Sequence, residues 1–104
     1  MPDWVRVAGE MFREHLQRCA ETGVPRLLYD VRELELHLRV IDLYEAGVAL
    51  AACPCAGVRI AFLVRPESTR RDHFFQTVAS NRGALVRVCT EEQAALTWLF
   101  GEGA

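Results

Sequence analysis

Apolar residues along this chain alternate between helical spacing and short uninterrupted runs. From Ala8 to Ala20 they recur every three or four residues, as on one face of an amphipathic helix, and Gly23 marks the end of that helix. Residues 27–31 (LLYDV) form a run that is too short for a helix and is apolar on both faces until Asp30. Such a run is typical of a central strand in a parallel sheet, so this part of the chain predicts a helix followed by a buried strand.

A second helix is predicted from Val40 to Ala52, where Asp42 and Glu45 are the only charged residues. A helix this apolar has to be covered nearly all round, either by its own domain or by a second subunit. We therefore expect a homodimer formed through the helix from Val40 to Ala52.

Residues 58–65 (VRIAFLVR) give the clearest strand, because they are rich in β-branched and aromatic side chains and are followed by Pro66. Thr69 with Asp72 three residues later predicts a capping box. The helix that begins there buries an apolar face and ends at Gly83.

Residues 85–89 (LVRVC) predict a further strand, and Thr90 with Gln93 predicts a capping box that begins the closing helix. Trp4 to Val7 alternates weakly and predicts a short additional strand at the start. The expected fold is one α/β domain over residues 1–104, with element order (β)αβαβαβα. Since parallel neighbours are joined by right-handed crossovers, we expect a small, mostly parallel sheet with helices on both faces.

Composition and charge narrow the function. The chain has 104 residues, of which 51% are hydrophobic, and 12 basic against 14 acidic side chains give a net charge of −2. This charge provides no field that gathers nucleic acid or anionic lipid. The longest uncharged stretch, residues 46–58, is shorter than the roughly 20 residues of a membrane span. The first residues lack the pattern of a secretion signal, so we expect a cytoplasmic protein with no nucleic-acid or membrane partner.

A candidate binding site lies where the predicted strands end, because ligands of open α/β sheets gather at the carboxyl ends of the strands. Its charged and hydroxyl side chains are Asp30, Arg32, Arg65, Ser68, Thr69 and Thr90. An acid, two guanidinium groups and hydroxyls near helix starts suit a small anion or an acidic partner side chain. Alternatively, the hydroxyls only begin helices and Asp30 forms a structural ion pair with Arg32.

Other chemistry is sparse. Cys53 and Cys55 suggest a redox pair or half of a soft-metal site, but the negative end of the preceding helix opposes a thiolate and no second ligand pair follows. His15, His37 and His73 show no metal-binding spacing, and phosphate-loop and nucleophile-elbow motifs are absent from the sequence. We therefore expect no metal, no cofactor and no catalytic activity.

Three segments together carry a family resemblance. They are the D-x-R pair at Asp30 and Arg32, residues 74–83 (FFQTVASNRG), and the acidic, Ala-rich closing helix at residues 90–99 (TEEQAALTWL). With these motifs the chain resembles, from about residue 9 to residue 99, the bacterial STAS-type proteins related to the sporulation anti-sigma-factor antagonist. That superfamily shares its architecture with small lipid-transfer folds.

The resemblance implies a non-catalytic protein-interaction domain that is regulated through partner binding. In such antagonists a serine near the start of the helix after the Asp30-like strand accepts a phosphate. This chain has no Ser or Thr between Asp30 and Ala52, so the phosphorylation switch does not carry over. The resemblance also implies that the chain begins after the first strand of the family. Arg82, at the opposite edge of the sheet, is a candidate for partner recognition or simply caps helix carbonyls.

Three hypotheses about function follow. The first is a regulatory interaction domain of the antagonist-like type, which binds an unidentified protein partner and forms a homodimer. The second is a module that binds a small ligand, such as an anion, a nucleotide or a lipid, at the carboxyl ends of the strands. The third is an enzyme or redox protein that uses Cys53 and Cys55, and it requires a thiol of lowered pKa.

Overall fold

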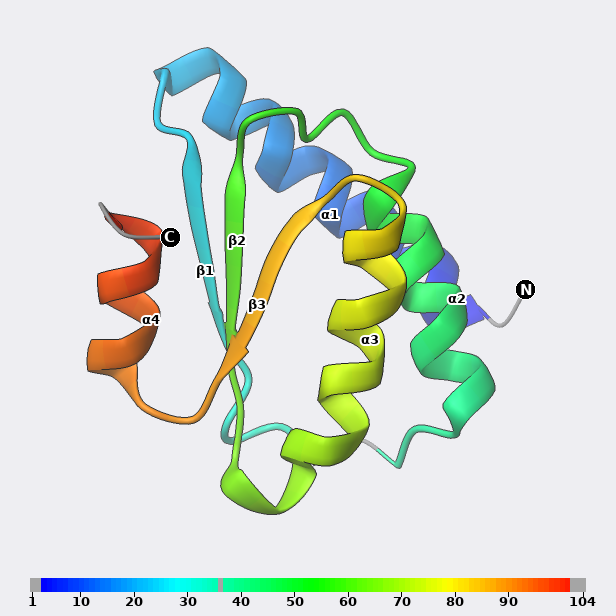
Figure 1. Cartoon of the computed structure of the whole chain (residues 1–104). Helices are drawn as coiled ribbons and strands as arrows, with labels where there is room; N and C mark the ends of the chain where they lie inside the picture. Colours follow the sequence, from blue (N-terminus) through cyan, green and yellow to red (C-terminus); the bar gives the residue numbers. More distant parts are fainter. Residues whose placement is uncertain (1–2, 36, 102–104) are drawn as a thin grey trace.

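The computed structural model describes residues 3–35 and 37–101. Over these residues a three-stranded parallel sheet is combined with four α-helices in the order αβαβαβα (Figure 1). The elements are α1 (Asp3–Thr22), β1 (Arg26–Asp30), α2 (Val40–Ala51), β2 (Arg59–Leu63), the 3-10 turn η1 (Pro66–Ser68), α3 (Thr69–Asn81), β3 (Leu85–Cys89) and α4 (Glu92–Leu99). The predicted α/β class and the parallel sheet are confirmed.

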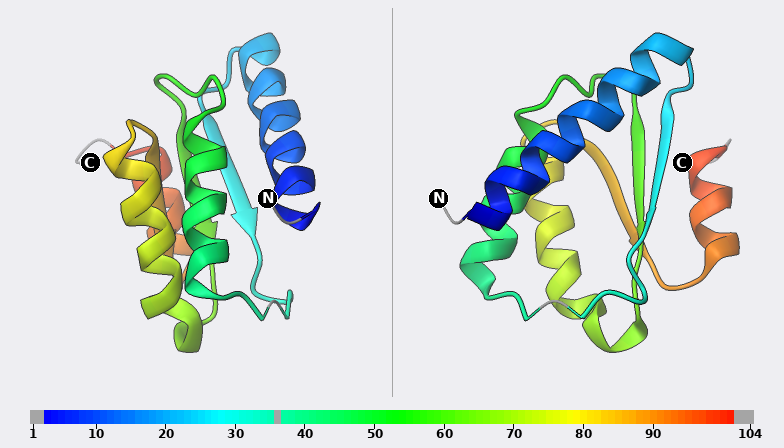
Figure 2. Two further views of the ribbon diagram at one scale, coloured as in Figure 1. Left: turned by 90° about the vertical axis from the view of Figure 1, so that its right-hand side faces the viewer. Right: turned by 180° about the vertical axis from the view of Figure 1, so that it is seen from behind.

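The strands lie in the order β1-β2-β3, and both pairs are parallel. Helices α1, α2 and α3 lie on one side of the sheet, and α4 lies on the other (Figure 2). The larger core cluster fills the three-helix side, where Leu50 and Ile60 are fully buried. On the other side, Ala61 of β2 packs against Ala95 and Leu99 of α4. Three helices against one make the two sides of the sheet unequal.

The additional strand expected at Trp4 to Val7 is wrong. These residues belong to α1, which begins at Asp3. Val5 is fully buried, and Gly9 and Phe12 continue its face at intervals of four and three residues, which is helical spacing. A run of four residues is too short to distinguish a strand from a helix by alternation alone, and packing against α2 decided in favour of the helix.

The two predicted capping boxes are also wrong. The hydroxyl of Thr69 donates to the carbonyl oxygen of Pro66 at 2.9 Å, and Ser68 is the N-cap residue of α3 without a side-chain cap bond. Glu91, and not Thr90, precedes α4. The reason at α3 is the turn η1, whose carbonyls take the hydroxyl hydrogen bond that a capping box directs forward into the helix.

Helix α2 lies between α1 and α3 (Figure 2). Its inward positions, such as Leu43 and Leu50, are buried, but Val40 is 64% exposed, Ile41 48% and Tyr44 40%. A single chain therefore leaves part of this apolar helix uncovered. None of the helices described here has both the length and the apolar composition that crossing a bilayer requires.

Candidate functional site

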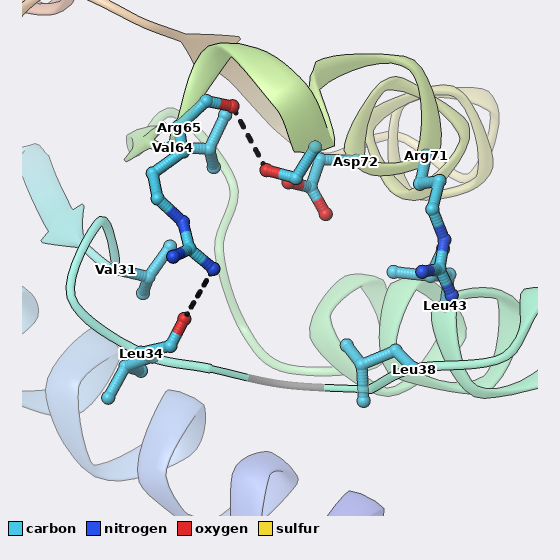
Figure 3. A pocket seen from close by; sticks show the side chains of 9 residues that line it. Val31, Leu34, Leu38, Leu43, Val64, Arg65, Arg71 and Asp72 are labelled. Atoms are coloured by element: carbon cyan, nitrogen blue, oxygen red, sulfur yellow. Dashed lines mark hydrogen bonds between the residues drawn. The ribbon is translucent and has the colours of Figure 1, made fainter.

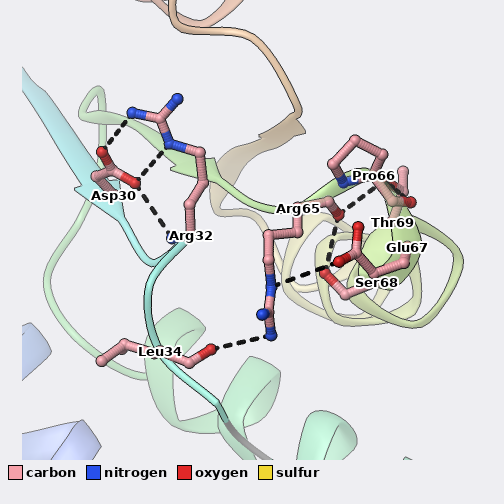
Figure 4. Close-up of polar contacts among 8 residues, drawn as sticks. All are labelled: Asp30, Arg32, Leu34, Arg65, Pro66, Glu67, Ser68 and Thr69. Atoms are coloured by element: carbon pink, nitrogen blue, oxygen red, sulfur yellow. Dashed lines mark hydrogen bonds and ion pairs between the residues drawn. The ribbon is translucent and has the colours of Figure 1, made fainter.

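Asp30 and Arg32 form a closed ion pair at the end of β1 (Figure 4). Arg32 donates to Asp30 three times: from Nη2 to Oδ2 at 2.7 Å, from Nε to Oδ1 at 3.0 Å, and from its backbone N to Oδ1 at 3.1 Å. The hydrogen bonds from Arg32 lower the pKa of Asp30 below its usual value. Asp30 and Arg32 thus form the structural ion pair that is the alternative interpretation of the sequence.

The predicted hydroxyl groups in the turn after β2 also form hydrogen bonds within the protein. Ser68 Oγ donates to the carbonyl oxygen of Arg65 at 3.0 Å, and the Thr69 hydroxyl is bonded within the turn as described. Arg65 itself reaches across to the segment after β1, where Nη2 donates to the carbonyl oxygen of Leu34 at 3.3 Å. Its Nε lies 3.9 Å from the carboxylate of Glu67. These are long contacts, so Arg65 is held loosely compared with Arg32.

Thr90 and Arg82 lie apart from this turn. Thr90 is half-buried after β3, and no hydrogen bond of its side chain occurs among the described residues. Arg82 is the C-cap residue of α3, at the opposite end of that helix, as the sequence predicts. Its Nη2 donates to the hydroxyl of Tyr44 at 3.0 Å, and its guanidinium lies over the Tyr44 ring at 5.8 Å. Arg82 therefore ties α3 to α2.

A pocket opens on the three-helix side near the carboxyl ends of the strands. It has a volume of about 200 Å³, and we call it the apolar pocket. The sheet, α1, α2, α3 and the segment after β1 all contribute to its walls. Prominent among the lining side chains are Met11, Phe12, Tyr29, Leu38, Phe62 and Phe75. Asp72 is the one charged residue that lines it among the residues described.

A smaller cavity of about 80 Å³ adjoins the apolar pocket, and we call it the mouth. The two share lining residues, including Leu34, Leu38 and Asp72. The mouth adds charged and polar side chains that the larger cavity lacks, namely Arg65, Ser68 and Arg71. Figure 3 shows Arg65 and Arg71 framing this space, with Asp72 between them. The charged side chains thus lie in a smaller cavity directly beside the apolar pocket.

Aromatic rings form the firmest part of the pocket wall. Tyr29 stacks on Phe62 with centroids 4.9 Å apart, and Phe75 meets the same Phe62 ring edge-on at 5.0 Å. The Tyr29 hydroxyl is hydrogen-bonded to Nδ1 of His15 at 2.7 Å. Burial, helped by the neighbouring Cys19 and Cys53, raises the pKa of Tyr29. The phenol stays neutral, and the wall offers an uncharged aromatic surface.

The charges at the mouth are largely unpaired. Within residues 3–35 and 37–101, the side chains of Asp72 and Arg71 take part in no ion pair or hydrogen bond. Asp42 gives a contrast on the neighbouring helix, because its carboxylate accepts hydrogen bonds from the backbone N of Arg39 at 2.8 Å and from the Arg39 guanidinium. The Asp42 carboxylate, which caps α2, is therefore paired. The Asp72 carboxylate in the mouth is unpaired among the described residues.

Sequence reasoning missed most of this site. The sequence predicts Asp72 only as part of a capping box, and Phe62 and Phe75 only as parts of a strand and of a helix with a buried apolar face. One signal was present in residues 33–38 (ELELHL), where every second residue is leucine. Of these, Leu34 and Leu38 line both cavities. Such alternation outside a strand indicates a loop with one apolar side, and that side has to lie against something.

The cysteines do not meet the requirement of the redox hypothesis. Cys53 and Cys55 are both buried, and burial raises the pKa of each thiol. The Cys53 thiol donates to the carbonyl oxygen of Ala49 at 3.3 Å. Within the described ranges, no three His, Cys, Asp or Glu side chains lie close enough together to hold a metal ion.

Comparisons with protein-family models, with curated proteins and with solved structures found no match. The resemblance to STAS-type proteins stays a prediction that these comparisons do not test.

Proposed function

We propose that this protein binds a small ligand with an apolar body, and that the apolar pocket is the binding site. The observation that carries this proposal is the pocket itself: about 200 Å³ lined by side chains from the sheet, three helices and a loop. It lies near the carboxyl ends of parallel strands, where open α/β sheets hold their ligands. Among the three hypotheses from the sequence, this is the small-ligand module.

The volume limits the size of the ligand. An apolar cavity of about 150 Å³ stays free of water and accepts benzene, whereas pockets for drug-sized molecules measure about 300–1,000 Å³. At about 200 Å³ the pocket suits one ring or a branched aliphatic group with a short substituent. A nucleotide or a long-chain lipid does not fit wholly inside this volume.

Indole and benzene serve as probes for this pocket, with amide NMR spectra of the whole chain as the measurement. We expect both probes to shift the amide signals of Phe62 and Phe75 in a saturable way. Ala8 of α1 lines the pocket, so Ala8→Leu fills part of it and should abolish the shifts. Ala20→Leu is the matched control, because Ala20 is exposed on the same helix and does not line the pocket. Shifts that are equally strong in Ala8→Leu place the probes elsewhere and contradict the proposal.

A second candidate function is the interaction domain with a homodimer through α2. The exposure of Val40, Ile41 and Tyr44 supports it, because an apolar cluster on one helix gains free energy when a second subunit covers it. Sedimentation at micromolar concentration tests the dimer. We expect Ile41→Arg to shift the protein to monomer, whereas Val7→Arg, at a 52% exposed position on α1, should not. A monomeric parent protein contradicts the dimer.

A further inference from the structure

The ligand that fits the pocket and its mouth together has an apolar body and a head group with both signs of charge. We infer that this ligand is a free apolar α-amino acid, whose side chain enters the apolar pocket while its ammonium group meets Asp72 and its carboxylate meets the guanidinium groups of Arg65 and Arg71. This inference rests on the proposed function, which it makes specific.

The first step is the arrangement of charges. Asp72 belongs to the first turn of α3 and lines both cavities, so it is within reach of a ligand that occupies the apolar pocket and the mouth together. Arg65, two residues beyond β2, and Arg71 line only the mouth. As Figure 3 shows, Arg65 and Arg71 lie on opposite sides of this space, and Asp72 lies between them.

The second step is that these charges are available. Asp72 and Arg71 are unpaired within the described residues, and Arg65 has only the long contacts to Leu34 and Glu67. Glu67 is 71% exposed, so water competes for that contact. Arg32, in contrast, is paired with Asp30 and points away from Arg65 in Figure 4. The mouth is the place at this edge where a ligand gains charge-assisted hydrogen bonds without breaking short ones.

The third step is selection among head groups. A simple carboxylic acid satisfies the guanidinium groups but places a negative charge beside the Asp72 carboxylate. A simple amine satisfies Asp72 but is repelled by Arg65 and Arg71. An α-amino acid carries both charges on adjacent atoms and meets both requirements. Its side chain, a ring or a branched aliphatic group, matches the size of the apolar pocket.

The test compares four probes by calorimetry on the whole chain: L-phenylalanine, 3-phenylpropionate, phenethylamine and glycine. The second lacks the ammonium group, the third lacks the carboxylate and the last lacks the side chain. Removing one partner of a charged hydrogen bond costs about tenfold or more in affinity. We therefore expect L-phenylalanine to bind at least about tenfold more tightly than each of the other three.

Charge-neutral variants then assign the two halves of the head group. Asp72→Asn should weaken L-phenylalanine about tenfold or more and leave 3-phenylpropionate no weaker. Arg71→Gln should weaken L-phenylalanine and leave phenethylamine no weaker. Arg70→Gln is the matched control, because Arg70 is an exposed neighbour on the same helix that lines neither cavity. Circular dichroism checks that each variant is folded.

The outcomes separate this inference from the proposed function. If indole binds but L-phenylalanine binds no better than its two deaminated or decarboxylated analogues, the amino-acid inference is wrong and the apolar pocket stands. If neither indole nor L-phenylalanine binds, the proposed function is wrong and the inference fails with it. If L-phenylalanine binds Asp72→Asn and Arg71→Gln as tightly as it binds the parent protein, the head group is held elsewhere and the inference is overturned.

Discussion

Gly47 shows how one missing side chain positions two helices. It lies in α2 against α3, and a Cβ atom at this position meets Val78 Cγ1 at 2.9 Å and the carbonyl oxygen of Phe75 at 3.2 Å. Both distances are shorter than ordinary van der Waals contact, and the carbonyl belongs to backbone that cannot turn away. The close approach of α2 and α3 therefore requires glycine here.

At Gly47→Ala an overpacking cost of about 1–3 kcal/mol opposes a gain of about 1 kcal/mol that alanine brings to a helix interior. We expect the cost to prevail because backbone is among the close contacts, with a net destabilisation of up to about 2 kcal/mol. Urea unfolding measures the change in the free energy of unfolding. Gly9→Ala is the control, since its nearest contact, Ala49 Cβ, lies at an acceptable 3.7 Å. We expect Gly9→Ala to be neutral or stabilising; if Gly47→Ala behaves the same way, the helices are free to separate.

The Asp30–Arg32 pair predicts a dependence of stability on pH. Because Arg32 lowers the pKa of Asp30 in the folded chain, the stabilisation is present above the unfolded value of about 3.9 and is lost as the pH falls through the lowered folded value. Arg32→Gln should raise the pKa of Asp30 toward its usual value in a carboxyl NMR titration. It should also lower the free energy of unfolding slightly at pH 7, with no difference left in strong acid. An unchanged titration of Asp30 speaks against the pair.

At the scale of elements, α4 depends on an arginine of β2. Nη1 of Arg59 donates to the carbonyl oxygens of Trp98 at 2.6 Å and Gly101 at 3.2 Å, at the end of α4. The Trp98 carbonyl also accepts from the backbone N of Gly101 at 3.1 Å, so Arg59 adds a charged donor to the turn that closes α4. Arg59 and Arg87 also lie over the Trp98 ring, at 5.5 and 5.6 Å. Polar contacts as well as apolar packing thus hold α4 against the sheet.

Arg59→Met should cost about 1.5–3 kcal/mol in the free energy of unfolding, because it removes charged hydrogen bonds but keeps an apolar stem. Arg87→Met removes only the contact with the Trp98 ring and should cost about 0.5–1 kcal/mol. Chemical unfolding followed by far-UV circular dichroism compares the two variants. Equal losses contradict the special role of Arg59.

The elements also show how far sequence reasoning reached. The predicted strand at residues 85–89 matches β3, and the other two differ from β1 and β2 by one or two residues at their ends. These runs were recognisable because apolar side chains on both faces require burial from both sides. The error at Trp4 to Val7 arose where the signal was shortest. There, contact with α2 outweighed local alternation.

At the scale of the whole molecule, the reactivity of the buried cysteines measures how often the fold opens. Cys19, Cys53 and Cys55 are buried, and burial raises the pKa of Cys53 and Cys55. A reagent reaches Cys53 and Cys55 only when the core separates. A domain stable by about 5 kcal/mol or more is open less than about one thousandth of the time.

Alkylation followed by peptide mass spectrometry should therefore find Cys53 and Cys55 at least about a thousandfold slower than a free thiol in native buffer. Cys89, which is half-buried, should react sooner. Added urea should speed Cys53 and Cys55 in step with global unfolding. Rapid reaction of either in native buffer would show an accessible thiolate and revive the redox hypothesis.

The sequence by itself determined the α/β class, the order of the elements from β1 onward, the parallel sheet and the edge at which polar side chains gather. Those features depend on local spacing and on which faces need burial, and both can be counted along the chain. Only the tertiary structure decided that Asp30 and Arg32 close on one another, that α2 remains partly exposed, and that Asp72 borders an apolar pocket. A cavity is the volume left between elements, and this volume depends on distances that no local pattern encodes.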